Sequence, residues 1–464
     1  MQKILAIAWL TWKAALRFRL FLVIAALLIL AVVGLPLVIK SDGTARGFTQ
    51  IILTYTLSAI TALLGFSTLW LSCGTLARDI EECQIQVVAT KPIARWQIWL
   101  GKWLGIVTLN AALLALSGAC IYGLLQWRAT KLPPAEQQIL HEQVLVARGV
   151  AKPENLEAQI DAETEREFQA RLKQHPELAS LSPADKEQVM NQIREQVKAP
   201  YQLVPPGYTR EWQINLGLAK NFLRDKPLQL RVKFNSASKS PSGTFVALWQ
   251  IGDPDSTNYV QLAPMSLAPD TFHEFSIPPN SFDKNGVLTV VFTNPNDTSL
   301  LFSVEDGMEL LYPEGGFALN FARGLGIIFC WMALLAALGL AAASLLSFPV
   351  AAFFSLAVMV VVLSSGTLAE AVANGTVGVG NEESTVGHTP VDVVLIPLFK
   401  GILVVVNLAQ NFSPIDSLSA GRAILWGDLG AAFGQIVLLL GGIVAIIGII
   451  LFNRRELATA QGNQ

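Results

Sequence analysis

Hydrophobic residues fall in long runs along this chain, and polar stretches separate the runs. A run of about 20 apolar residues is long enough for one helix to cross the hydrocarbon core of a bilayer. Such runs lie near residues 20–39, 51–76, 99–125, 324–346, 350–366 and 429–452. The pattern therefore predicts a polytopic α-helical membrane protein with about six transmembrane helices.

A seventh apolar stretch, residues 393–409, differs from the others. It is short for a crossing, carries Lys400 in its middle and contains Pro397. Counting it as a crossing would also place the basic residues near the C-terminus on the side opposite the other basic residues. We therefore predict a re-entrant or interfacial segment on the outer side of the membrane.

A long polar insert separates the third run from the fourth. Its first part, residues 127–200, is polar and rich in helix-forming residues. Ser182 followed by Pro183 is a typical helix start, with an N-cap hydroxyl before a proline at the first helical position. We predict a helical segment here, and the flanking ranges 1–126 and 317–464 hold the predicted transmembrane helices.

The second part of the insert, residues 201–316, changes to strand patterns. In "LQLRVKF" apolar residues alternate with Gln229, Arg231 and Lys233, which indicates one buried face and one face toward water. Turn clusters such as "GDPDSTN" and "IPPNSFDKNG" separate several short runs of this kind. The spacing predicts an antiparallel β-sandwich.

The positions of Lys and Arg orient the predicted helices. Basic residues lie before Leu20, in the segment from Arg78 to Lys102, and at Arg454 and Arg455. Six crossings place all of them on one side, which the positive-inside rule makes cytoplasmic. Both termini are therefore predicted to be cytoplasmic, and the polar insert is predicted to lie outside the cytoplasm.

The residues before the first run predict an amphipathic helix in the cytoplasmic interface. In "MQKILAIAWLTWKAALRFR", helical spacing places Leu5, Trp9, Trp12 and Leu16 on one face, and four basic residues add positive charge. The alternative is that these residues are only a charged flank of the first transmembrane helix.

Composition agrees with membrane insertion. The chain is 52% hydrophobic and 15% charged, against about 25% charged residues in an average soluble domain. A net charge of −2 provides no basic face for nucleic acid. The four cysteines lie in or beside the apolar runs without metal-binding spacing, so we expect neither a disulfide framework nor a zinc site.

The sequence offers no pattern typical of an enzyme. The four histidines, His141, His175, His273 and His388, are scattered. Gly101 and Lys102 lack the upstream glycine and the following Ser or Thr of a phosphate-binding loop. We therefore expect no bound cofactor and no catalysis by this chain, and any ATP would be bound by another chain.

The segment "LARDIEECQIQVVATKPIARWQIWLGKWLG" is charged, although it lies between two apolar runs. Its charges predict a cytoplasmic loop over residues 78–98 that a partner protein can grip. The alternative is a solvated hairpin whose Lys and Arg residues only fix the membrane topology.

With these residues, the chain resembles ABC-2 type transporter permeases, the transmembrane subunits of ATP-driven transporters. The resemblance rests on the N-terminal helix leading into "KAALRFRLF", on "ARDIEECQIQVVATKPIARWQIWLGKWLG", and on the ending "IGIILFNRREL". It covers both ends of the chain, roughly half of its length. Cys83 departs from the pattern, since many relatives have glycine there.

The resemblance implies a coupling helix that docks on a separate ATPase subunit, which would bind ATP and Mg²⁺. It assigns docking to Arg78, Asp79, Glu81, Glu82, Lys91, Pro92 and Arg95. It also implies an exporter-type complex in a bacterial plasma membrane, in which two permease subunits form a homodimer or a pair of similar chains. The substrate and the direction of transport stay open.

The β half of the insert resembles jelly-roll, galactose-binding-like modules, which bind sugars on aromatic rings. Trp212, Trp249, Tyr259 and Phe272 are candidate platforms for a saccharide. The alternatives are that these rings belong to the core, or that the insert docks an envelope protein or the partner protomer.

Two other functions stay open: a membrane-anchored binding or sensor protein, and a carrier driven by ion gradients. Scarce ionisable residues in the apolar runs count against the carrier.

Overall fold

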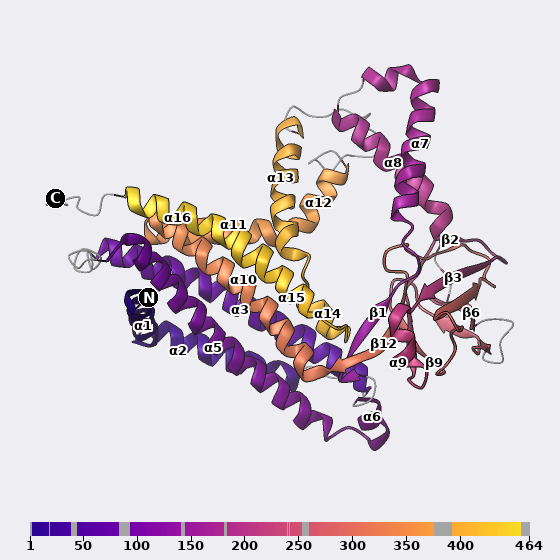
Figure 1. Cartoon of the computed structure of the whole chain (residues 1–464), viewed down its shortest axis with the longest axis horizontal. Helices are drawn as coiled ribbons and strands as arrows, with labels where there is room; N and C mark the ends of the chain where they lie inside the picture. The colour runs from indigo at the N-terminus through magenta and orange to yellow at the C-terminus, as the bar shows by residue number, and fades with distance from the viewer. Residues whose placement is uncertain are drawn as a thin grey trace. The chain divides into compact units, whose positions relative to one another are not determined.

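The computed structural model describes residues 2–17, 19–38, 44–82, 93–140, 144–180, 183–238, 240, 242–252, 259–374 and 392–455 (Figure 1). The chain divides into two compact units. Unit 1 comprises Met1–Ala147, Gly315–Ala369 and Leu398–Gln464, and unit 2 comprises Arg148–Glu314 and Glu370–Pro397. Each unit has its own hydrophobic core and is described by itself.

Helices make up unit 1. The first are α1 (Gln2–Arg17), α2 (Arg19–Val38), α3 (Ala45–Glu81), α5 (Arg95–Ala129) and α6 (Pro134–Ile139). Later in the chain follow α10 (Phe317–Leu345), α11 (Phe348–Leu363), α12 (Ser365–Asn374), α13 (Asp392–Gln410), α14 (Pro414–Ser419), α15 (Trp426–Ala432), a π-helical stretch (Phe433–Gly441) and α16 (Gly442–Arg454). The bounds given by the structure divide α12 and α13 between the two units.

Four helices are long and apolar enough to cross a membrane: Thr49–Glu81, Arg95–Ala129, Phe317–Leu345 and Trp426–Arg454. They correspond to four of the six predicted crossings, and they indicate a membrane-embedded protein. The other two predicted crossings fall on α2 and α11, apolar helices of 20 and 16 residues. For these two helices, crossing the membrane stays a prediction. The same holds for the outer placement of residues 393–409, which fall on α13.

Small residues allow the long helices to pack closely. Gly339 of α10 lies so near Ser72 of α3 that a Cβ atom at Gly339 would overlap the Ser72 hydroxyl. In the same interior, Asn110 Nδ2 donates a hydrogen bond of 2.8 Å to Thr68 Oγ1. Close approach of small residues and buried polar pairs are typical of helices packed within membranes.

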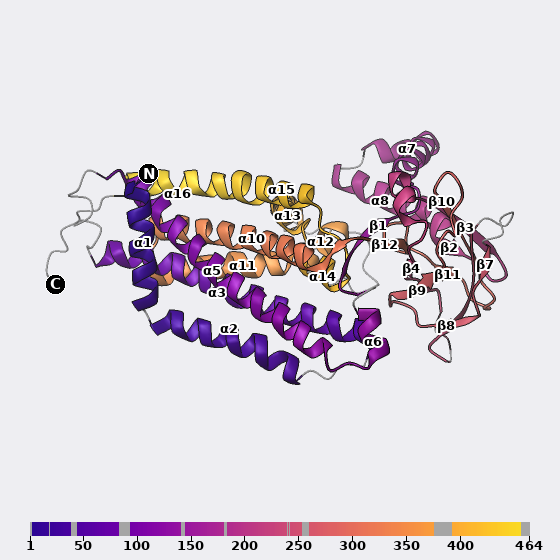
Figure 2. The same cartoon turned by 60° about the horizontal axis from the view of Figure 1, so that its bottom comes forward.

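The N-terminal helix α1 runs across the long helices, as Figure 2 shows. It packs on α5, where a Cβ atom at Gly101 would lie 2.7 Å from Ile7 Cβ and one at Gly105 would lie 2.8 Å from Thr11 Cβ. Trp9, in contrast, is 60% exposed. The predicted N-terminal helix is therefore present, with Ile7, Ala8, Thr11 and Ala15 buried and Trp9 exposed. Its position in a membrane interface stays a prediction.

Unit 2 contains α7 (Glu157–Gln174), α8 (Pro183–Gln202), the short α9 (Lys220–Leu223) and two main antiparallel sheets. One sheet has the order β1-β12-β4-β9, and the other has β3-β10-β6-β7, with β8 paired to β6. The bounds are β1 Val146–Ala151, β2 Leu203–Val204, β3 Thr209–Asn215, β4 Leu228–Val232, β5 Asn235–Ser236, β6 Phe245–Ile251, β7 Val260–Gln261, β8 Met265–Leu267, β9 His273–Ile277, β10 Val287–Thr293, β11 Leu300–Leu301 and β12 Met308–Gly316.

Both main sheets contribute to one core. Leu230 of β4 and Leu310 of β12, from the first sheet, lie in the same buried cluster as Trp249 of β6 and Val290 of β10, from the second. The predicted β domain is therefore present. The start of α8 at Pro183 also follows the prediction, although Ser182 lies outside the described residues.

Two features of unit 2 differ from what the sequence pattern predicts. The strand β1 lies within 127–200, for which only helices were predicted. The expectation that Gln229 and Arg231 face water was wrong, because their exposed fractions are 4% and 7%. The physical reason is that charged side chains of neighbouring strands cover and pair with them, as described below.

Candidate functional site

The predicted docking residues lie at one end of the helices of unit 1. Arg78, Asp79, Glu81 and Glu82 lie at the end of α3, and Arg95 is the first residue of α5. Lys91 and Pro92, the other two docking candidates, lie outside the described residues. The structure therefore shows where the loop leaves α3 and where it enters α5, and it describes five of the seven candidates.

Asp79 is bound to a lysine inside the helical unit. Lys102 Nζ lies 2.5 Å from Asp79 Oδ2 and 2.9 Å from the carbonyl oxygen of Thr75. Lys102 is 7% exposed, so its ammonium group depends on these two acceptors. Because Lys102 belongs to α5 and Asp79 to α3, the ion pair fixes the two ends of the predicted loop to each other.

Glu81 and Arg78 contact the start of another helix. The backbone N–H of Phe348 donates a hydrogen bond of 2.9 Å to Glu81 Oε1. This N–H is at the first position of α11, where helical N–H groups have no partner within their own helix. The guanidinium carbon of Arg78 lies 4.7 Å from the centre of the Phe348 ring. The end of α3 is thereby attached to the start of α11.

Arg95 contacts the end of the last helix. Its Nη1 donates hydrogen bonds to the carbonyl oxygens of Phe452, Asn453 and Arg455, at 3.2, 2.9 and 2.9 Å. The last carbonyl groups of a helix have no partner within the helix and carry partial negative charge, so a guanidinium group stabilises them. The start of α5 is thereby attached to the end of α16.

Arg455 extends the same arrangement to α10. Its Nη1 lies 3.2 Å from the carbonyl oxygen of Ala343 and 3.3 Å from that of Ser344. These carbonyl groups belong to the last turn of α10. Charged side chains at this end of unit 1 therefore attach five helices to one another: α3, α5, α10, α11 and α16. We call these residues, Arg78, Asp79, Glu81, Arg95, Lys102 and Arg455, the charged cluster.

Four residues of the charged cluster, Arg78, Asp79, Glu81 and Arg95, were predicted as docking residues and not as contacts between helices, and docking stays a prediction. Lys102, Phe348 and Arg455 were not among the predicted site residues, although they bind those residues. A signal for Lys102 was present, since a lysine at the start of an apolar run needs a partner to be buried. The signal was not sufficient, because the sequence does not show which of several acidic residues is close.

The four predicted aromatic platforms do not form one surface. Trp249 is fully buried and packs 4.8 Å from Phe292 and 6.5 Å from Trp212 between ring centroids. Its ring therefore has no exposed face in this structure. Tyr259 is half-buried, and Phe272 is 39% exposed.

Cations cover two of these rings. The guanidinium carbon of Arg231 lies 3.9 Å from the centre of the Phe272 ring, and that of Arg210 lies 5.2 Å from the Trp212 ring. Burial lowers the pKa of Arg210 from its usual value. An arginine still keeps its charge near neutral pH. The prediction of a saccharide site is therefore carried by Trp212, Tyr259 and Phe272, and at Trp212 and Phe272 a cation already lies at the ring.

A polar network covers one face of the first sheet of unit 2. Arg148 Nη1 lies 2.9 Å from Glu274 Oε2 and also binds Gln229, and Arg231 Nε lies 3.7 Å from Glu274 Oε1. Arg231 Nη1 also lies 4.0 Å from Glu309 Oε2. Among the described residues this network pairs two positive charges with two negative charges, and such pairing allows the groups to be buried. The network explains why the polar positions of β4 are not exposed to water.

Neither a search for metal-binding groups nor a comparison with known proteins indicates the chemistry of this chain. Within the described ranges, no group of three or more His, Cys, Asp or Glu side chains is placed to hold a metal ion. No family model matches this chain, and no curated protein or solved structure matches it either.

Proposed function

We propose that this chain is the membrane-spanning permease subunit of an ATP-driven ABC transporter, of exporter type. A separate ATPase subunit would bind the cytoplasmic loop between α3 and α5 and would hydrolyse ATP with Mg²⁺. The proposal includes six membrane crossings, a jelly-roll-like domain outside the cytoplasm, a bacterial plasma membrane and pairing of two permease subunits. It also places both termini in the cytoplasm.

The charged cluster is the observation that supports this proposal best. A partner that moves the loop between α3 and α5 also moves Asp79, Glu81 and Arg95, which lie at the ends of the loop. Through their contacts, the movement reaches the ends of α10, α11 and α16. Transport by rocking of a helical unit requires a local push to act on several helices together.

Co-purification tests the proposal. The full chain is purified from membranes of its own host, and a Walker-type ATPase is sought in the same fraction by mass spectrometry and by ATP hydrolysis. We expect Glu82→Arg, which reverses an exposed charge in the predicted loop, to lose most of the ATPase. The matched control is Lys131→Glu, which reverses an exposed charge beyond the other end of α5. Retention of the ATPase by Glu82→Arg, or its absence beside the wild type, would argue against the proposal.

Thiol labelling tests the topology independently. Cys83 lies in the predicted cytoplasmic loop. A membrane-impermeant maleimide should not label Cys83 in intact cells and should label it in inside-out vesicles. A Cys83→Ser variant identifies the labelled band, and labelling of Cys83 from outside the cell would exclude ATPase docking at this loop.

Deletion of residues 148–314, the larger part of unit 2, separates the permease from a membrane-anchored binding protein. We expect the shortened chain to keep the ATPase, because the charged cluster lies in unit 1. If the ATPase is lost while the shortened chain remains in the membrane, unit 2 is the functional part. Binding of saccharides by the full chain would then be the next measurement.

A further inference from the structure

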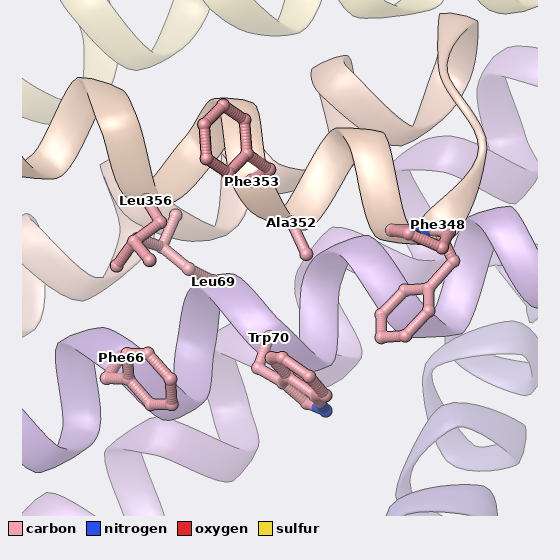
Figure 3. Close-up of a pocket in the computed structure, with 8 residues that line it drawn as sticks. Phe66, Leu69, Trp70, Phe348, Ala352, Phe353 and Leu356 are labelled. Atoms are coloured by element: carbon pink, nitrogen blue, oxygen red, sulfur yellow. The ribbon is translucent and has the colours of Figure 1, made fainter.

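A groove of about 330 Å³ lies between α3 and α11 (Figure 3). Its volume is within the range of about 300–1,000 Å³ that is usual for small-molecule sites. The lining residues are all apolar: Phe66, Leu69, Trp70, Phe348, Pro349, Ala352, Phe353 and Leu356. Phe66 is 47% exposed and Phe353 is 73% exposed, so the groove is open along one side.

One end of the groove leads to a cation. The Phe348 ring makes an edge-to-face contact with Trp70, with 5.2 Å between centroids, and its own face lies 4.7 Å from the guanidinium carbon of Arg78. Gly74 lies beside this ring, and a Cβ atom there would be in ordinary van der Waals contact with it, at 3.4 Å. The side chains therefore change from apolar to positively charged along α3, from Phe66 to Arg78.

The carboxylate of Glu81 is bound to the start of α11. Glu81 Oε1 accepts the hydrogen bond from the backbone N–H of Phe348, at the positive end of the α11 dipole. Arg78 itself is exposed, so its guanidinium group can be reached from the surrounding solvent or membrane. The combination of an open apolar groove and an exposed cation at its end fits a ligand with an apolar chain and an anionic group.

A lipid fits this combination better than a helix of a second copy. Helices that pack against each other in membranes approach closely at small residues. The exposed lining residues here are bulky: Phe66, Trp70, Phe353 and Leu356. Basic residues beside a membrane surface attract anionic lipids. Arg78 lies in the last turn of α3, so in a membrane crossed by α3 it would lie near the lipid head groups.

We propose that this groove binds one acyl chain of an anionic phospholipid, whose phosphate group contacts Arg78. The chain would lie along Trp70, Phe353 and Leu356, and the head group would lie beyond Phe348. This inference requires only that α3 and α11 lie in a membrane, and it does not depend on an ATPase partner.

Photolabelling of the full chain in lipid vesicles tests the site. The vesicles contain a trace of phosphatidylglycerol with a photoreactive group in the acyl chain, or phosphatidylcholine with the same chain as the control lipid. We expect labelled peptides that contain residues 66–70 and 348–356, and stronger labelling by phosphatidylglycerol. Arg78→Gln should lower labelling by phosphatidylglycerol about fivefold and leave labelling by phosphatidylcholine unchanged.

A pair of tryptophan substitutions on α11 tests the groove itself. Ala352→Trp fills the groove and should remove most of the labelling by both lipids. Val360→Trp adds the same side chain on the same helix at a position that is 53% exposed and does not line the groove. It should leave the labelling unchanged. If Ala352→Trp does not fold, as judged by its thermal unfolding, Ala352→Leu provides a smaller obstruction.

Three results would overturn the proposal. The first is equal labelling of the groove by the two lipids, and the second is unchanged labelling in Arg78→Gln. The third is efficient disulfide formation between two copies of Phe353→Cys in vesicles, because it would show that a second copy covers the groove.

Discussion

Lys102 and Asp79 form an ion pair between two helices, with 2.5 Å between Nζ and Oδ2. The side chain of Lys102 is 9% exposed and that of Asp79 is 32% exposed. The two partners therefore differ in how strongly each depends on the other. Lys102 has replaced most of its water by the carboxylate of Asp79 and the carbonyl oxygen of Thr75, whereas Asp79 keeps contact with solvent.

This difference predicts unequal effects of removing each partner. Asp79→Asn leaves a buried ammonium group without its counter-charge and should lower the free energy of unfolding by about 3 kcal/mol. Lys102→Met leaves a carboxylate that water can solvate and should cost less. The double variant should be more stable than the sum of the two single changes predicts. Thermal unfolding in detergent measures all three, and equal losses for the two single variants would contradict this account.

The crossing of α1 and α5 predicts a strong effect at one glycine. A Cβ atom at Gly101 would lie 2.7 Å from Ile7 Cβ and 3.0 Å from the Ile4 carbonyl oxygen. Gly101→Ala should therefore displace α1 and lower the free energy of unfolding by about 1–3 kcal/mol. Gly123, also in α5, has no atom within 4 Å of such a Cβ atom.

Gly123→Ala is therefore the matched control for Gly101→Ala. It should be neutral or stabilise the helix by up to about 1 kcal/mol, because alanine favours a helix more than glycine does. Unfolding temperature and protease sensitivity of the first 17 residues measure the difference. If the two variants behaved alike, the close packing of α1 on α5 would not exist in the membrane.

The contacts of Arg95 predict a local loss of protection at the other end of the chain. Arg95→Gln removes the guanidinium group that binds the carbonyl oxygens of Phe452, Asn453 and Arg455. A hydrogen bond to a charged group contributes about 1.5–3 kcal/mol to stability. Without these bonds the last turn of α16 should open more often. Amide hydrogen exchange of residues 446–455 should become at least severalfold faster.

Arg17→Gln provides the comparison for Arg95→Gln. It removes an exposed arginine at the end of α1. Exchange in α16 should stay at the wild-type rate in this variant. Unchanged exchange in Arg95→Gln itself would mean that Arg95 is available to a partner protein rather than bound to α16.

The aromatic residues of unit 2 differ in burial, so we expect their substitutions to differ in how much they lower the stability of unit 2. Trp249→Ala removes a fully buried ring and should lower the free energy of unfolding of unit 2 by about 3–5 kcal/mol. Phe272→Ala removes a ring that is 39% exposed and contacts Arg231, and it should cost about 1 kcal/mol. Tryptophan fluorescence during denaturation measures both changes in the free energy of unfolding. If Trp249→Ala lost saccharide binding but kept the stability of unit 2, Trp249 would not be a core residue.

Local patterns in the sequence predicted much of the fold. Apolar runs predicted the long helices α3, α5 and α10, and the alternation in "LQLRVKF" predicted the strand β4. These predictions succeed because each pattern depends on residues that are close in the chain. The strand β1 was missed, because "VARGVA" is short and becomes a strand only beside β12.

The charged residues show the limit of such predictions. Arg78, Asp79, Glu81 and Arg95 were predicted as a group on the basis of their position between two apolar runs. Their partners lie 23 to 360 positions away along the chain, as with Lys102 for Asp79 and Arg455 for Arg95. Nothing local distinguishes a charge that will bind a neighbouring helix from a charge that will meet a partner protein.

The hydrogen bond between Glu81 and the backbone of Phe348 also restricts how unit 1 can move. Only Leu346 and Ser347 separate α10 from α11, and this short connection restricts how far the start of α11 can move from the end of α10. If α11 swung away from α3 at this end, both this hydrogen bond and the contact of the Phe348 ring with Trp70 would be lost. A hinge at the start of α11 is therefore costly, and any tilting of α11 relative to α3 should open the far end of the pair while the Glu81 end acts as the pivot.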